Sequence, residues 1–193
     1  MRRPSPLALV VTLAALGGGW LLLVALPRWY GPRQPSVPAE AAPAPPPARR
    51  ITARLFHVAE NGLELAAVER EVPYAESTAA QARLLVEEQL KPPPPPYASA
   101  IPPGTRLRAL FITSSGEAFV DFSGEIAAAH PGGSREELFT VYAIVNAVTA
   151  NLPAVSAVQI LVDGREVDTL AGHVDLRRPL PGTFRLAGAK PSP

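Results

Sequence analysis

The stretch that decides the fold runs from Val120 to Val167. It begins VDFS, passes through a Gly-Gly loop, and continues SREELFTVYAIVNAVTANLPAVSAVQILVDGREV from Ser134 onwards. The pattern predicts a strand, a helix with apolar residues at helical spacing, and a second strand that ends in a turn at Asp163-Gly164. β-Branched residues give this helix only moderate intrinsic propensity, so burial has to stabilise it. We therefore expect a small packed domain.

Capping boxes predict where the two helices of the chain begin. In the spacing S-x-x-E, the first side chain caps the helix and the fourth reaches back to the capping residue. Ser134 and Glu137 show this spacing before the second helix. Thr78 and Gln81 show a similar spacing at the start of an earlier helix, predicted over residues 78–90. Prolines follow that helix directly and must end it.

Strands are predicted on both sides of each helix, because short β-branched runs alternate with turn signals. The hairpins are closed by turns such as Asn61-Gly62, which tolerate a positive φ. The expected strands are residues 51–58, 63–72, 106–113, 117–123, 155–162 and 165–170. The order ββ-α-ββ-α-ββ predicts an α+β domain, with a mixed, mainly antiparallel sheet and both helices packed on one face.

The N-terminus predicts a membrane anchor. After a short basic segment at residues 1–6, residues 7–26 carry no charge, and a helix of that length spans about 30 Å, the thickness of the bilayer core. A cleaved signal peptide is the alternative, but small residues are poorly placed for cleavage. We expect a single-pass protein of the cytoplasmic membrane, with the N-terminus inside and the C-terminal domain extracytoplasmic, on the periplasmic or wall side.

Composition divides the rest of the chain into three parts. Residues 27–50 form a Pro/Ala-rich linker, in which eight of 24 residues are proline and an extended chain is favoured. Residues 51–180 are long enough for one domain with its own core. Residues 181–193 are expected to be a flexible tail.

Charge and cysteine content exclude several functions. Residues 1–50 hold six Arg and one Glu, a net charge of +5, whereas residues 51–193 hold 12 Lys+Arg and 16 Asp+Glu, a net charge of −4. An acidic domain without a basic stripe is a poor nucleic-acid binder, so we expect no nucleic-acid partner. The chain has no cysteine, which excludes disulfides and thiolate-bound metals.

The five prolines at 92–96 allow two interpretations. They resemble a ligand for a polyproline-binding groove. They also form a stiff strut that carries the chain from the first helix back to the sheet. Because the run lies inside the domain, we favour the strut.

No catalytic constellation is recognisable, and none of the common nucleophile, phosphate-loop or zinc motifs occurs. The three histidines are far apart in sequence. Glu69 and Glu71 share one face of a strand, which is usually its wet face. Other acidic residues fall at strand ends or turns, where carboxylates are ordinarily solvated. The side chains that could take part in catalysis or metal binding are His57, His130, His173, Asp121, Asp163, Glu166 and Asp168. We assign no catalytic, cofactor-binding or metal residue, expect no cofactor, and do not expect an enzyme.

Four motifs together resemble the GerMN (germane) domain of sporulation, spore-germination and cell-envelope proteins. They are AIPPGTRLR at 100–108, VDFS at 120–123, the stretch at 134–167 quoted above, and GHVDL at 172–176. The resemblance covers roughly residues 52–180. It implies an extracytoplasmic, membrane-tethered module, with an α+β fold similar to ring-building domains of secretion and sporulation assemblies. The family supplies no catalytic residue to carry over.

Two non-catalytic functions remain open. The domain is either an assembly module that meets an envelope protein or a copy of itself through sheet edges or helix faces, or a module that binds peptidoglycan or another glycan. Glycan platforms use exposed aromatic side chains, and the domain has no tryptophan and only Tyr74, Tyr97 and Tyr142 as tyrosines. This scarcity favours assembly.

Overall fold

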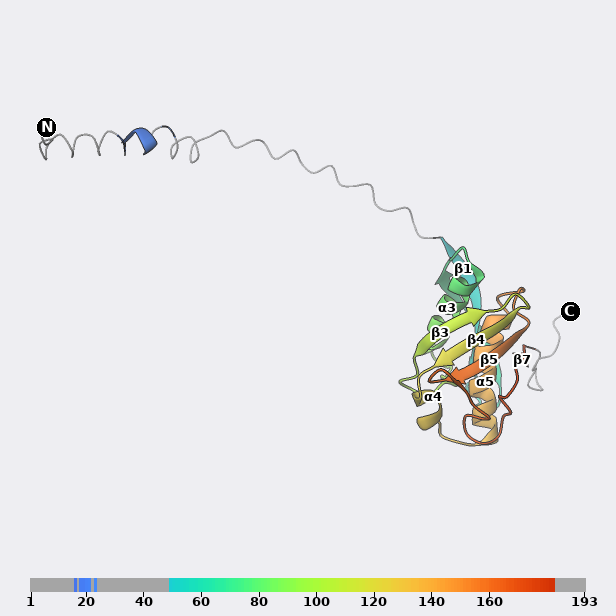
Figure 1. Cartoon of the computed structure of the whole chain (residues 1–193). Coiled ribbons are helices and arrows are strands. Elements are labelled where there is room, and N and C mark those ends of the chain that lie inside the picture. The colour runs from blue at the N-terminus through green and yellow to red at the C-terminus, as the bar shows by residue number, and fades with distance from the viewer. Residues whose placement is uncertain (1–15, 17, 22, 24–48, 183–193) are drawn as a thin grey trace, which may run out of the picture. The chain divides into compact units, whose positions relative to one another are not determined.

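A computed structural model describes residues 49–182 of the chain, together with residues 16, 18–21 and 23 (Figure 1). Within residues 49–182 strands and helices alternate, and the predicted α+β class is confirmed. The elements are β1 (Arg50–Val58), β2 (Leu65–Pro73), α3 (Thr78–Gln89), β3 (Leu107–Ile112), β4 (Glu117–Phe122), α4 (Glu125–Ala128), α5 (Ser134–Thr149), β5 (Ala157–Val162), β6 (Arg165–Glu166) and β7 (Leu180–Pro181). The short helix α4 is an addition to the predicted elements.

The strands form two separate sheets. β1 and β2 make an antiparallel hairpin of their own, and the larger sheet has the order β3-β4-β5-β6, with β7 also paired to β5. β4 and β5 are parallel, and the other strand pairs of this sheet are antiparallel. Parallel strands need a crossover connection, which α5 supplies between β4 and β5. The mixed, mainly antiparallel character is as predicted.

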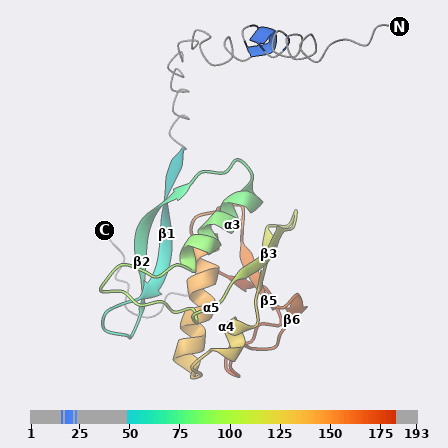
Figure 2. The ribbon, with the colours of Figure 1, turned by 90° about the vertical axis from the view of Figure 1, so that its left-hand side faces the viewer.

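The helices α3 and α5 lie between the hairpin and the larger sheet, so the domain has three layers (Figure 2). A helix enclosed on two sides must be apolar around most of its circumference. This explains the composition of α5, whose buried residues are Glu137, Phe139, Thr140, Val141, Ala143, Ile144, Val145, Asn146, Ala147 and Val148. The sequence predicted that α5 packs one face against a sheet, and the structure adds the β1–β2 hairpin on the other side of the helix.

Both predicted helix caps are wrong by one residue. Ser77, and not Thr78, caps α3 by accepting the Ala80 backbone N–H at 3.2 Å. Gly133 precedes α5 with φ 91°, and no side chain caps that helix. The capping box failed at α5 because Glu137 is buried and its carboxylate hydrogen-bonds to a distant loop.

The proline run leads the chain back to the hairpin, but it is not a straight strut, because Pro95 and Pro96 form a turn in which the Tyr97 N–H donates to the Pro94 carbonyl at 3.1 Å. After Pro92–Pro96, Ala98 pairs with Val58 in both directions, with N–H···O distances of 2.9 and 3.0 Å. Farther along the chain, the strand predicted at 165–170 shortens to β6. The two residues of β7 lie at the predicted boundary between the domain and the tail, and residues 183–193 lie outside the described residues.

The predicted single-pass localisation requires correction. A bilayer crossing needs about 20 apolar residues in one helix, and no helix among the described residues reaches that length and apolarity. Apolar composition over residues 7–26 identifies only a candidate span, and most of that range lies outside the described residues.

Candidate functional site

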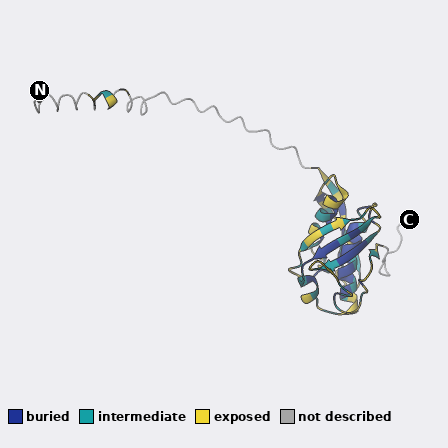
Figure 3. Ribbon diagram, viewed as in Figure 1, coloured by how far each residue is buried: buried dark blue, intermediate teal, exposed yellow. Residues whose placement is uncertain are grey.

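One face of the larger sheet is free of any helix of the described chain over β3 and β4 (Figures 1 and 3). Ala118, Val120 and Phe122 point into the core and are fully buried. Successive side chains of a strand alternate between faces, so Phe119 and Asp121 lie on the opposite side. Their register partners share that side, and we call these residues the outer sheet face: Ala109, Phe111, Phe119, Asp121, Gln159 and Leu161. Asp121 and Gln159 are buried, and the Gln159 amide donates to the Leu176 carbonyl of the loop that covers β5.

Two phenylalanines form the centre of the outer sheet face. Phe111 on β3 lies directly opposite Phe119 on β4, and Phe111 is 63% exposed. Cross-strand aromatic pairs stabilise a sheet, but a phenylalanine this exposed keeps most of its apolar surface in water. From the sequence, only tryptophan and tyrosine were considered as possible binding platforms, so this phenylalanine pair was missed. Strict alternation along residues 117–122 was the available signal, because it places Phe119 on the face opposite Ala118, Val120 and Phe122.

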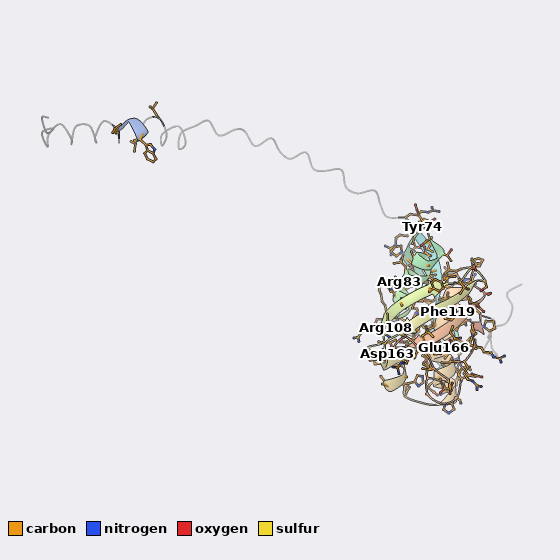
Figure 4. All side chains as sticks on the ribbon, in the orientation of Figure 1. Tyr74, Arg83, Arg108, Phe119, Asp163 and Glu166 are labelled. Carbon is orange, nitrogen blue, oxygen red and sulfur yellow. The ribbon has the colours of Figure 1, made fainter. Side chains whose placement is uncertain are left out.

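A charged cluster lies at one end of the outer sheet face. The register of β3 and β4 shifts between Leu107 and Ala109, which leaves Arg108 as an extra residue in a β-bulge. Its guanidinium lies 3.2 Å from Asp121 and 3.5 Å from Asp163. Figure 4 shows Arg108 and Asp163 side by side at this end of the sheet.

The interactions of this charged cluster position two backbone segments, the β3 bulge and the turn at Asp163-Gly164. Asp121 accepts the Gly164 N–H at 2.7 Å through its other oxygen, so both of its oxygens are engaged. Asp163 adopts φ 51°, a left-handed conformation that aspartate tolerates in turns. A Cβ atom at Gly124 would lie 2.7 Å from the Asp163 carboxylate, so a larger residue there would push this exposed side chain away from its place beside Arg108. Two carboxylates around one guanidinium fix the bulge and the β5–β6 turn.

The three histidines do not share a site. His57 is 1% exposed, and neither of its ring nitrogens has a hydrogen-bond partner among the described residues. His130 lies 3.1 Å from the Thr140 hydroxyl and accepts the Gly132 N–H. His173 lies 3.2 Å from Glu137. Over residues 49–182, no group of three or more His, Asp or Glu side chains is placed to hold a metal ion.

Burial sets the charge state of His57. Burial penalises the charged imidazolium, and the nearby Arg70 adds repulsion, so the pKa of His57 falls to about 4. The ring is therefore neutral at pH 7. Because neither ring nitrogen has a hydrogen-bond partner among the described residues, this buried neutral imidazole is a packing residue in this fold.

Glu137 is the most strongly engaged acidic residue. One carboxylate oxygen accepts the backbone N–H groups of Leu170 and Ala171 at 2.8 and 2.9 Å, and the other accepts the His173 N–H at 2.7 Å. Burial alone would raise the pKa of Glu137, but these donors outweigh it and lower the pKa below its ordinary value. The charged carboxylate fastens the loop at 168–173 to the start of α5.

The remaining acidic candidates lie apart from one another. Glu166 is on β6 opposite Leu161, and the Asp168 carbonyl accepts the Leu176 N–H at 2.8 Å. Glu69 and Glu71 are exposed on the hairpin face away from the helices, so the prediction of a wet face is confirmed. None of these carboxylates joins Asp121 and Asp163.

The tyrosines are also dispersed. Tyr74 is 38% exposed, and the Arg49 guanidinium stacks 4.0 Å from its ring centroid. Tyr97 lines a groove of about 420 Å³ together with four prolines and six other residues between the end of α3 and the start of β3: Leu90, Pro92, Pro93, Ala98, Ser99, Ile101, Pro102, Pro103, Gly104 and Thr105. This groove has no charged side chain in its lining, which gives it no means of acid–base chemistry.

Comparison with solved structures identifies the same fold elsewhere. The chain is 22% identical to the first GerMN domain of the sporulation protein GerM from Bacillus subtilis, with a TM-score of 0.54, and the match covers 68% of this chain and 97% of that one. The tandem GerMN domains of the same protein match with 21% identity and a TM-score of 0.52, over 74% of this chain and 51% of that chain. No curated protein matches the sequence.

The family comparison agrees with the resemblance seen in the motifs. The model of the Germane family, described as "Sporulation and spore germination", matches residues 54–168. That range runs from β1 past β6 and includes the outer sheet face. The chain belongs to the Germane (GerMN) family of sporulation and spore-germination domains.

Proposed function

We propose that residues 51–180 form a non-catalytic assembly module, which binds another protein, either an envelope protein or a second copy of this chain, through the outer sheet face. The observation that carries the proposal is the phenylalanine pair, in which Phe111 is exposed and Phe119 is half-buried. Phe111 is 63% exposed and lies opposite Phe119 on a face that no described helix covers. Aromatic side chains in the centre of an apolar patch are the commonest anchors of protein interfaces.

The surroundings of the pair suit docking of a protein. Arg108 is held by Asp121 and Asp163, so the sheet under the patch is pinned at one end. A rigid, charged border beside apolar side chains is the usual anatomy of a protein interface. The helix faces, which were the other expected surfaces, offer less, because α5 is enclosed between the two sheets.

Binding of peptidoglycan or another glycan is the second candidate. Tyr74 supports it, since this exposed ring carries a hydroxyl that a sugar could contact. The phenylalanines favour protein, because they offer apolar surface without a hydrogen-bonding group. Catalysis finds no support in the site, where the carboxylates are engaged with backbone and with Arg108.

Photo-crosslinking of the full chain tests the proposal. A benzophenone side chain at position 111 should give one discrete crosslinked product, either with a second copy in the purified protein or with one partner in cells. Leu63 is the matched control, because it is 64% exposed and lies outside the larger sheet. Equal crosslinking from positions 63 and 111 would contradict the proposal. Sedimentation of the chain with purified cell-wall sacculi would support the glycan candidate instead.

A further inference from the structure

The outer edge of β1 is closed by side chains at every second residue. The amide of Asn151 pairs with both the N–H and the C=O of Arg54, at 2.8 and 2.7 Å. Gln89 does the same for Phe56, at 2.8 and 2.7 Å. The backbone of Ala98 completes the row at Val58. Two amides and one residue of backbone therefore replace a neighbouring strand over residues 54–58, and no chain can add to this part of the edge.

The outer edge of β2 is open. The backbone N–H and C=O groups of Arg54, Phe56 and Val58 point away from β2. Those of the alternate residues 53, 55 and 57 therefore point toward β2, where they lie opposite residues 70, 68 and 66. The intervening residues Ala67 and Glu69 therefore direct their N–H and C=O groups outward. Neither residue has an outward hydrogen-bond partner among the described residues. Figure 2 shows β2 at the margin of the hairpin.

The other strand edges are less suited to adding a strand. β3 carries the bulge at Arg108, and Arg106 directly precedes the strand; a bulge and charged side chains both discourage edge pairing. β6 and β7 are only two residues long each. β2 has nine residues in regular register with β1, and its last residue, Pro73, ends the ladder.

We propose that β2 is a docking strand, to which an extended segment of another protein adds as a third strand of the hairpin sheet. This surface is separate from the outer sheet face and does not depend on Phe111. Addition of a strand satisfies the outward N–H and C=O groups of Ala67 and Glu69, and side chains then decide which segment fits.

Charge specifies the segment that fits. Glu69 and Glu71 are exposed on the outer face of the hairpin, and no ion pair involves either carboxylate among the described residues. On the other face Val68 lies beside the added strand. The partner segment therefore alternates lysine or arginine with β-branched apolar residues. A second copy of β2 fits poorly, because antiparallel self-pairing sets the carboxylates of Glu69 and Glu71 against each other.

The probe is a capped heptapeptide of alternating valine and lysine, with the same peptide carrying glutamate in place of lysine as its control. The full chain is titrated with each peptide, and the backbone amide signals of Ala67, Glu69 and Glu71 are followed by NMR. We expect the lysine peptide to slow hydrogen exchange at Ala67 and Glu69, and to bind about tenfold more tightly than the glutamate peptide.

Ala67→Pro removes an outward N–H and leaves the pairing of β1 with β2 intact. It should weaken binding of the lysine peptide by about tenfold or more, whereas Ala67→Val should keep it. If Ala67→Pro lowers the unfolding midpoint, the double variant Glu69→Lys/Glu71→Lys serves instead, and it should reverse the preference between the peptides.

Three results would overturn the proposal. The first is equal affinity for the two peptides, and the second is binding that neither Ala67→Pro nor the charge reversal changes. The third is a dimer of the chain alone, seen by sedimentation, that Ala67→Pro dissociates, because it would make a second copy the occupant of this edge. Crosslinking from position 111 is unaffected by each of these results, so the outer sheet face is tested independently.

Discussion

The Glu137 carboxylate accepts the backbone N–H of His173 at 2.7 Å, although the two residues are 36 positions apart in the chain. Glu137 is on the first turn of α5, and His173 is in the loop that follows β6. The same carboxylate binds two further N–H groups of this loop. One buried charge thus fastens the N–H groups of an irregular segment to the start of α5.

Glu137→Gln should lower the free energy of unfolding by about 2–4 kcal/mol, measured by urea denaturation of the full chain. The glutamine amide loses the charge and presents N–H donors where backbone donors already point. Glu136→Gln is the matched control, because Glu136 is the preceding residue and its exposed side chain pairs with Arg135 at the surface. The unfolding midpoint of that control should hardly change, and equal effects of the two substitutions would contradict the role given to Glu137.

Acid should destabilise the domain in two separate steps, and His57 causes the first. The pKa of His57 falls from 6.5 in the unfolded chain to about 4 in the fold, so the unfolded state binds more protons between these values. The free energy of unfolding therefore keeps its full value above pH 6.5 and declines by about 3 kcal/mol as the pH falls to 4. The pKa of Glu137 is also lowered, so its contribution persists above 4.5 and is lost only at lower pH.

His57→Leu should remove the first step, because leucine neither titrates nor buries an unpaired polar atom. The test is the free energy of unfolding of both proteins at pH 7, 6, 5 and 4. We expect the curve of the variant to be flat down to about pH 5 and to lie above that of the parent at pH 5. Parallel curves over this range would show that His57 is not the titrating group.

The elements were predictable because their signals are local. Apolar periodicity located α5, and Asn61-Gly62 and Asp163-Gly164 located two turns between strands. The caps were not predictable, because S-x-x-E spacing at Ser134 cannot reveal that Glu137 binds backbone 33 to 36 residues away. Competition between a local and a distant hydrogen-bond partner is decided by packing, which the spacing of residues does not contain.

The candidate site was harder to predict than the fold. Asp121 and Asp163 were recognised as residues at a strand end and a turn, but the bulge that brings Arg108 to them depends on strand register. Phe111 was placed in a strand, yet its exposure follows from the absence of a covering layer over β3 and β4 in the described chain. The hairpin packs against the helices instead, which a list of elements in chain order does not reveal.

The side chains that close the β1 edge should contribute measurably to stability. Gln89 is 1% exposed and replaces a neighbouring strand at Phe56. Gln89→Leu leaves one backbone donor and one acceptor unpaired, so the free energy of unfolding should fall by about 1–3 kcal/mol in urea denaturation. Glu87→Leu is the control on the exposed side of α3, where loss of a surface pair with Arg83 should cost little. If the Gln89 variant were as stable as that control, water would be replacing the amide at the Phe56 backbone with no loss of unfolding free energy.

Two glycines with positive φ separate backbone strain from close packing. Gly62 has φ 68° and nothing within 4 Å of the position of a Cβ atom, whereas Gly116 has φ 85° and a Cβ there would lie 2.7 Å from the Ala154 carbonyl oxygen. Gly62→Ala should therefore lose only the strain of a left-handed residue, about 1 kcal/mol of unfolding free energy. Gly116→Ala should lose at least about 2 kcal/mol, because the carbonyl must also move and Ser156 donates its N–H to the Gly116 carbonyl at 2.8 Å. Urea denaturation of both variants measures the difference. Equal losses would mean that the β3–β4 turn shifts freely against the start of β5, and the outer sheet face would then lack the rigid support that its proposed docking role requires.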